Sequence, residues 1–424
     1  MDLANTRQRR PVTRRGRIPA LRMLSACLPA VLSMVLCSVP RTSQAEPSTA
    51  SPAYTPSISL LGFGTLGFAR SNDDDAEFVR DLSQAYGVRT DWSPKIDSLL
   101  GVQANMRLTP QTNAVVQALS RYRYDGSYGP EISWAFLRHE FSSQWAARAG
   151  RMGTDFYMHA DSRLIGYANL TVRPPQDFYG QLIFSYFDGV DVTATFPLGN
   201  GLLEAKLFAG QAAEKTSMKD SLTWDLRGSD IRGGYLDYTV GPWQLRLGTT
   251  QVRFEHEIPI VELVGANAFA IAPELKVKGR KTRYDAIGIA YEDGPLEIQA
   301  MANRVVHDSE FYRDTRSAYV IGAYRIGSVT PYLGYSQIRS SAPDIRSPIP
   351  SGARPLIDLI TSNFYAHQNT VALGVRWDVA PRIALKGQID RIDGKPESIF
   401  PYRGETPDWD GDMTVFSVTM DFVF

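Results

Sequence analysis

The chain ends in the stretch MTVFSVTMDFVF, residues 413–424, in which apolar and polar side chains alternate. Successive side chains of an extended strand point to opposite faces, so this stretch predicts a β-strand with one apolar and one mostly polar face. The apolar face carries Phe416, Val418, Met420, Phe422 and Phe424. Such a strand suits the edge of a soluble antiparallel sheet, a β-sandwich, or a barrel with lipid outside and water inside.

The N-terminal segment indicates export from the cytoplasm. Residues 1–45 contain an Arg-rich start, an apolar run at 23–39 and a small-x-small site at 43–45. This is the three-part pattern of a signal peptide that is removed by cleavage; a retained membrane anchor is the alternative. Removal takes away both Cys residues, eight basic residues and one acidic residue, which leaves 37 basic and 44 acidic residues, a net charge of −7. The mature chain, residues 46–424, then has no thiol chemistry, no basic patch for nucleic acid and no apolar run of membrane-helix length.

Alternating segments recur along the mature chain and pair around short turns. In residues 190–210, two alternating runs flank a Gly-Asn-Gly turn at 199–201, which is a hairpin signal. Seven segments have this form: 97–124, 131–153, 190–210, 233–254, 284–305, 318–339 and 369–392. Together with an opening strand at 57–69 and the closing strand at 413–424, they predict 16 strands.

The connections between these hairpins are mostly longer than the turns within them. They lie at about 70–95, 125–130, 154–188, 213–231, 255–282, 306–316, 340–366 and 392–412. Long and short connections alternate in bacterial outer-membrane barrels, which have short periplasmic turns and long extracellular loops. We therefore predict an all-β fold: a transmembrane antiparallel β-barrel of 16 strands in the cell outer membrane.

At this point the chain resembles the general porins of Gram-negative bacteria. Two stretches carry the resemblance: the closing strand with its terminal Phe424, and RAGRMGTDFY at 148–157. The resemblance implies a water-filled channel for passive diffusion of ions and small hydrophilic solutes, and a homotrimer. It also implies that the closing strand is the signal for the barrel assembly machinery. The third long loop, at about 154–188, would fold into the pore and narrow it.

Candidate pore residues follow partly from strand phase and partly from this resemblance. Arg121 and Arg123 share a strand face with Gln117 and are interpreted as lumenal, with a position at the rim as the alternative. Arg151 matches the constriction arginine of the family, although Arg148 and Arg151 have opposite phase. Asp155 and Asp161 are the expected acidic partners from the loop. Charges on the less apolar strand faces are expected to line the lumen: Glu204, Lys206, Asp237, Arg246, Arg376, Lys386, Asp390 and Asp421.

Enzymatic and metal-binding signals are weak. No Gly-x-Ser-x-Gly elbow is present, and the His residues lack metal-binding spacing. The acidic runs at 73–75 and 408–412 are interpreted as solvated loop carboxylates, with a calcium or magnesium site as the alternative. We expect neither an enzyme nor a cofactor or metal. An adhesive or structural barrel, and an outer-membrane hydrolase without the elbow, remain as alternatives.

Overall fold

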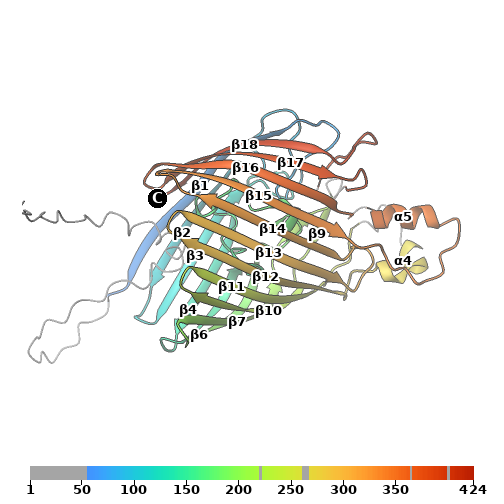
Figure 1. Ribbon diagram of the computed structural model, residues 1–424. Coiled ribbons are helices and arrows are strands. Elements are labelled where there is room, and N and C mark those ends of the chain that lie inside the picture. Colours follow the sequence, from blue (N-terminus) through green and yellow to red (C-terminus); the bar gives the residue numbers. More distant parts are fainter. Residues whose placement is uncertain (1–54, 219–221, 260–266, 363–364, 399–401) are drawn as a thin grey trace, which may run out of the picture. The chain divides into compact units, whose positions relative to one another are not determined.

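A computed structural model describes residues 55–218, 222–259, 267–362, 365–398 and 402–424. These residues form a closed barrel of 16 antiparallel strands (Figure 1), so the predicted fold class and strand number are confirmed. Each strand pairs with its neighbours in the sequence, and β1 pairs with β18 to close the barrel. The predicted signal peptide, residues 1–45, lies outside the described residues.

The barrel strands agree closely with the predicted segments. They are β1 (Ser57–Ser71), β2 (Leu99–Arg107), β3 (Thr112–Arg121), β4 (Glu131–Glu140), β5 (Trp145–Gly153), β6 (Tyr186–Leu198), β7 (Gly201–Ala212), β10 (Asp230–Val240), β11 (Trp243–Arg253), β12 (Lys281–Asp293), β13 (Leu296–His307), β14 (Thr315–Tyr324), β15 (Val329–Ser340), β16 (His367–Ala380), β17 (Ile383–Gly394) and β18 (Met413–Val423).

The connections alternate between short and long, as predicted. The seven predicted hairpins are the pairs β2–β3, β4–β5, β6–β7, β10–β11, β12–β13, β14–β15 and β16–β17. The longer connections contain small elements that the sequence did not predict: η1 (Gly166–Ala168), α2 (Gln176–Tyr179), the two-stranded sheet of β8 (Lys215–Ser217) and β9 (Thr223–Asp225), α4 (Asn267–Ile271), η3 (Pro273–Leu275) and α5 (Arg354–Ser362). Among the described residues, no helix is both long and apolar enough to span a membrane.

The two faces of the sheet differ in the way that the alternation predicts. On β11, Trp243, Leu245 and Leu247 are exposed on the outside, whereas Arg246 and Thr250 point into the barrel. The same phase holds on β18, where Val418 and Met420 are exposed outside and Asp421 is buried inside. At these positions the apolar side chains point outward and the polar ones inward.

The closing strand is seated on glycines of the opening strand. Gly62 and Phe424 exchange both backbone hydrogen bonds, at 2.8 and 2.9 Å, and Gly64 pairs with Phe422. The two Phe rings stack on each other, with ring centroids 6.3 Å apart, and lie over these glycines. A Cβ atom at Gly62 or Gly64 would overlap a ring, so the absence of a side chain there makes room for the aromatic end of the chain.

Candidate functional site: the loop inside the barrel

The connection between β5 and β6, residues 154–185, folds into the barrel, and we call it L3. Its first ion pairs reach the wall at β7 and β11. The Asp155 carboxylate lies 2.9 Å from Lys206 Nζ and 2.8 Å from Arg246 Nη1, and Arg246 also pairs with Asp237. Although burial opposes ionisation, Lys206 and Arg246 hold the pKa of Asp155 below its ordinary value. The predicted loop acid Asp155 therefore faces cations of the wall.

Asp161, the second predicted loop acid, follows Asp155 further along L3 in the sequence. Burial, together with the negative charge of Asp155, raises the pKa of Asp161 above its ordinary value. The neighbouring His159 is half-buried, and desolvation together with the positive charge of Arg246 lowers the pKa of its imidazole to about 4. His159 is hence neutral at physiological pH, and Asp155 is the loop acid that pairs with cations of β7 and β11.

The middle of L3 is bound to the opposite side of the barrel by Lys386. Its Nζ donates to the backbone oxygens of Gly166, Asn169 and Thr171 at 2.7, 2.6 and 3.0 Å. It also lies 3.0 Å from the Asp421 carboxylate, and both side chains of this ion pair are 0% exposed. Arg376 adds bonds to the carbonyls of residues 167 and 169. These contacts hold L3 against β16, β17 and β18.

Arg173 forms the second buried attachment of L3. Its guanidinium lies 2.7 Å from Asp97 and 3.0 Å from Asp390, and it donates to Ser417 Oγ. Asp97 precedes β2, so a single side chain connects L3 with the connection between β1 and β2, with β17 and with β18. The two carboxylates and the hydroxyl accept hydrogen bonds from this buried guanidinium. Such partners are needed because burying a charge without them costs a large amount of free energy.

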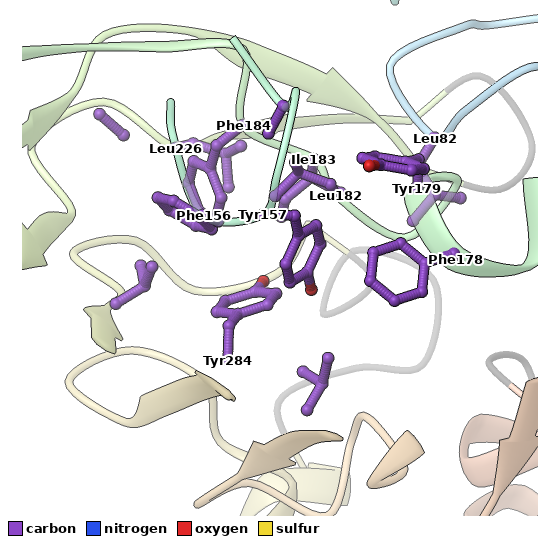
Figure 2. Packing of buried hydrophobic residues seen from close by; sticks show 14 of the residues in the cluster. Leu82, Phe156, Tyr157, Phe178, Tyr179, Leu182, Ile183, Phe184, Leu226 and Tyr284 are labelled. Atoms are coloured by element: carbon purple, nitrogen blue, oxygen red, sulfur yellow. The ribbon is translucent and has the colours of Figure 1, made fainter. Parts of the chain in front are cut away.

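Both ends of L3 pack through aromatic side chains (Figure 2). The ring centroids of Tyr157 and Phe178 lie 4.8 Å apart, and Phe178 is 5.0 Å from Tyr319 on β14. Phe156 lies 5.2 Å from Tyr284 on β12. These residues belong to one buried apolar cluster between L3 and the wall. L3 therefore contacts both sides of the barrel.

The predicted lumen-wall charges all lie on the inner faces of their strands. Besides the pairs described above, Glu204 accepts a hydrogen bond from Tyr235 at 2.8 Å, and Arg376 pairs with Asp378 at 2.9 Å. The sequence did not indicate that most of these charges would be engaged by L3. It also missed Arg173 and Asp97, which lie outside the strands, where no periodicity marks a lumenal side chain.

Arg151 was predicted to lie at the pore constriction, but its side chain lies on the outer face of the barrel. Arg151 pairs with Asp188 at 2.7 Å on the face of β5 and β6 that also carries Val190, which is 55% exposed on the outside. Arg148 has the opposite phase and points inward, where it pairs with buried Asp191. Since the strand phase was ambiguous from the sequence, only the pairing with β6 assigns Arg148 to the lumen.

Arg121 and Arg123 lie near the rim that bears the long connections. Arg121 is buried and donates to Ser83 Oγ and Ser185 Oγ at 2.7 and 3.1 Å, while its Nε pairs with Glu131. Arg123 follows the end of β3 and also pairs with Glu131. The two arginines thus form their ion pairs with carboxylates near this rim of the barrel. Within the described residues, no group of three or more His, Cys, Asp or Glu side chains is arranged to hold a metal.

Comparisons with known proteins support the fold. No protein-family model matches the sequence. No curated protein sequence matches it either. Several solved structures, in contrast, are similar to this chain. OmpF of Salmonella typhi, in complex with daunomycin, has a TM-score of 0.55 at 9% identity, covering 87% of this chain and 97% of that chain.

Two further structures are similar to this chain. The outer membrane channel DcaP of Acinetobacter baumannii has a TM-score of 0.53 at 13% identity, covering 88% of this chain and 99% of that chain. An anion-selective porin from Comamonas acidovorans has a TM-score of 0.50 at 16% identity, covering 87% and 100%. At such identities the likeness establishes the fold alone, which is that of the porin barrels.

Proposed function

We propose that this protein is an outer-membrane porin that lets ions and small hydrophilic solutes diffuse passively through its barrel. The observation that carries the proposal is a closed barrel of 16 strands with an apolar outer face and an inner face of charged side chains. An apolar exterior fits a lipid bilayer, and a closed sheet leaves no unpaired backbone edge in it. We assign no chemical reaction and no cofactor to the chain.

The charged inner wall supports passage of ions rather than a purely structural role. Fixed charges in a narrow space with low-dielectric walls concentrate counter-ions and repel co-ions. Both signs occur around L3, with Asp155 between Lys206 and Arg246, and with Asp421 beside Lys386. We therefore expect modest ion selectivity, and a conductance that is small for a barrel of this strand number because L3 contacts opposite sides of the wall.

The proposal includes a route to the membrane. Residues 1–45 would direct export through the inner membrane and be cleaved. The barrel assembly machinery would then recognise the closing strand, whose terminal Phe424 pairs with the opening strand. The short turns would face the periplasm and the long connections the exterior. Assembly as a homotrimer is part of the proposal through the resemblance to porins.

Single-channel recording of the purified protein in a planar bilayer tests the function. We expect discrete, low conductance steps, and a reversal potential under a salt gradient that changes as salt screens the lumen charges. Heat-modifiable migration in gels provides the control that the barrel is folded. A folded barrel without any conductance would refute the porin function and favour the adhesive or hydrolytic alternatives.

A further inference from the structure

A second cavity-forming region lies among the long connections, beside the aromatic part of L3. It has a volume of about 60 Å³. Its lining comes from β8, β9, β12, β13 and β14, from the end of L3, and from the connections after β1, β8, β11, β13 and β17. A cavity needs roughly 10–15 Å³ of such volume to hold one water molecule, so this cavity has room for several waters or for one six-membered ring. Nothing in the ion-pair network of L3 uses this space.

Several aromatic side chains line this cavity. Trp224 lies with its ring centroid 4.7 Å from Phe254 and 5.9 Å from Tyr312, and the last two rings also line the cavity. Tyr284, whose ring centroid lies 5.2 Å from that of Phe156 of L3, also lines the cavity. Flat rings on several sides favour a flat apolar group, because aromatic pairs gain energy beyond simple burial of area.

The charged side chains of the cavity are basic. Arg313 and Arg403 line it, whereas none of the described lining residues is Asp or Glu. Arg313 donates through Nε to the backbone oxygen of Thr361 at 2.8 Å and stacks on Tyr365, with 4.8 Å from Cζ to the ring centroid. Its side chain is only half-buried, so a guanidinium is accessible at this end of the cavity. Guanidinium groups bind planar carboxylates well because their donors form a fork.

Trp224 provides an independent indication of a ligand. The residue is 1% exposed, and its indole Nε1–H has no hydrogen-bond acceptor among the described residues. A buried donor without an acceptor costs about 1–3 kcal/mol, and native structures have few such groups. An acceptor atom on a molecule in the cavity would satisfy this donor.

We propose that this cavity binds a small aromatic carboxylate of the size of benzoate. The ring would pack among Trp224, Phe254 and Tyr312, and the carboxylate would accept from the Trp224 Nε1–H and from Arg313. The site would retain such anions at the mouth of the barrel before they pass L3. This inference deepens the proposed porin function and rests on it for the subsequent transport.

Equilibrium binding to the purified, folded barrel in detergent tests the site separately from the channel. Isothermal titration with benzoate should show one saturable site, and benzylamine, which has the same ring and the opposite charge, should not bind. Trp224→Phe keeps an aromatic ring at this position but removes the Nε1–H donor together with part of the indole. Since a hydrogen bond to a charged group contributes about 1.5–3 kcal/mol, this variant should bind benzoate at least roughly tenfold more weakly.

Matched variants keep the inference falsifiable. Arg313→Gln should weaken benzoate binding to a similar degree. Trp243→Phe makes the same substitution on the outer face of β11 and should leave binding unchanged. No saturable benzoate binding by the folded wild type, or equal binding by wild type and Trp224→Phe, would overturn the site. If benzoate does not bind but the conductance is normal, the porin function is still supported. If benzoate binds but the protein does not conduct, the binding site is supported and the channel function is refuted.

Discussion

Replacing Lys386 by Met should release the middle of L3 from the wall. Met keeps most of the length of the Lys stem but removes the ammonium group. The change leaves the Asp421 carboxylate buried without its cation, and it deprives the carbonyls of Gly166, Asn169 and Thr171 of a donor. Arg376 still donates to the carbonyls of residues 167 and 169, so L3 should loosen rather than leave the lumen.

The size of the effect follows from the burial of this pair. Both side chains of the Lys386–Asp421 pair are 0% exposed, and removing one partner of a buried ion pair costs about 3–5 kcal/mol. If this cost falls on the docking of L3, the undocked population rises between roughly a hundredfold and a few thousandfold, at about 1.4 kcal/mol per factor of ten. A loop that undocks more often should also make the conductance larger and noisier.

Hydrogen exchange of the backbone amides in residues 163–173, measured on the folded barrel in detergent, would report the undocking. The matched control is Arg391→Met on the same strand. Its ion pair with Asp412 is 2.8 Å long but 51% and 38% exposed, so its loss should cost no more than about 1 kcal/mol. Conductance of both variants in planar bilayers would connect the loop motion with the pore.

Equal exchange of residues 163–173 in Lys386→Met and in Arg391→Met would refute the argument. It would mean that Arg173 and the aromatic cluster hold L3 without the help of Lys386. If Lys386→Met does not fold, the loss of the ion pair destabilises the whole barrel rather than the docking of L3. The double variant Lys386→Met/Asp421→Asn leaves no buried carboxylate without a cation, so it should fold again and still show faster exchange in L3.

Three further predictions concern other parts of the barrel. Arg148→Ala removes the nearer cation of Asp191, whose remaining ion pair, with Lys206, is 3.9 Å long, and it should shift the reversal potential toward cations at low salt. Arg151→Ala, on the outer face, should not shift it, and bilayer recordings of both variants decide this. Glu214 lies buried between β7 and β8, and burial raises its pKa to about 7. The folded state therefore binds this proton more tightly than the unfolded chain, and the free energy of unfolding should fall as pH rises from about 4.5 to about 7. Glu214→Gln should remove this slope in urea titrations. Deletion of Phe424 should lower the amount of heat-modifiable barrel in outer-membrane fractions without reducing export to the periplasm, and normal amounts in the membrane would contradict the assembly role.

The strands and their faces were determined by the sequence alone. The two-residue period of side-chain direction, the turn residues between paired runs, and the alternation of short and long connections are local properties. They predicted the 16 strands, the seven hairpins and the inward direction of charges such as Lys386 and Asp421. The same local period could not decide whether Arg148 or Arg151 faces the lumen, because the two have opposite phase and each has an acidic partner across the strand pair.

The arrangement inside the barrel was decided only by the tertiary structure. Arg173 lies 217 residues from Asp390, and Asp155 lies 91 residues from Arg246, yet each pair is in direct contact. A loop that is not a strand has no period from which its contacts can be read, and its position results from ion pairs and aromatic packing with walls that exist only after the barrel has closed. For this reason the sequence indicated a pore with a third loop inside it, while the attachments of that loop and the aromatic cavity beside it came from the fold.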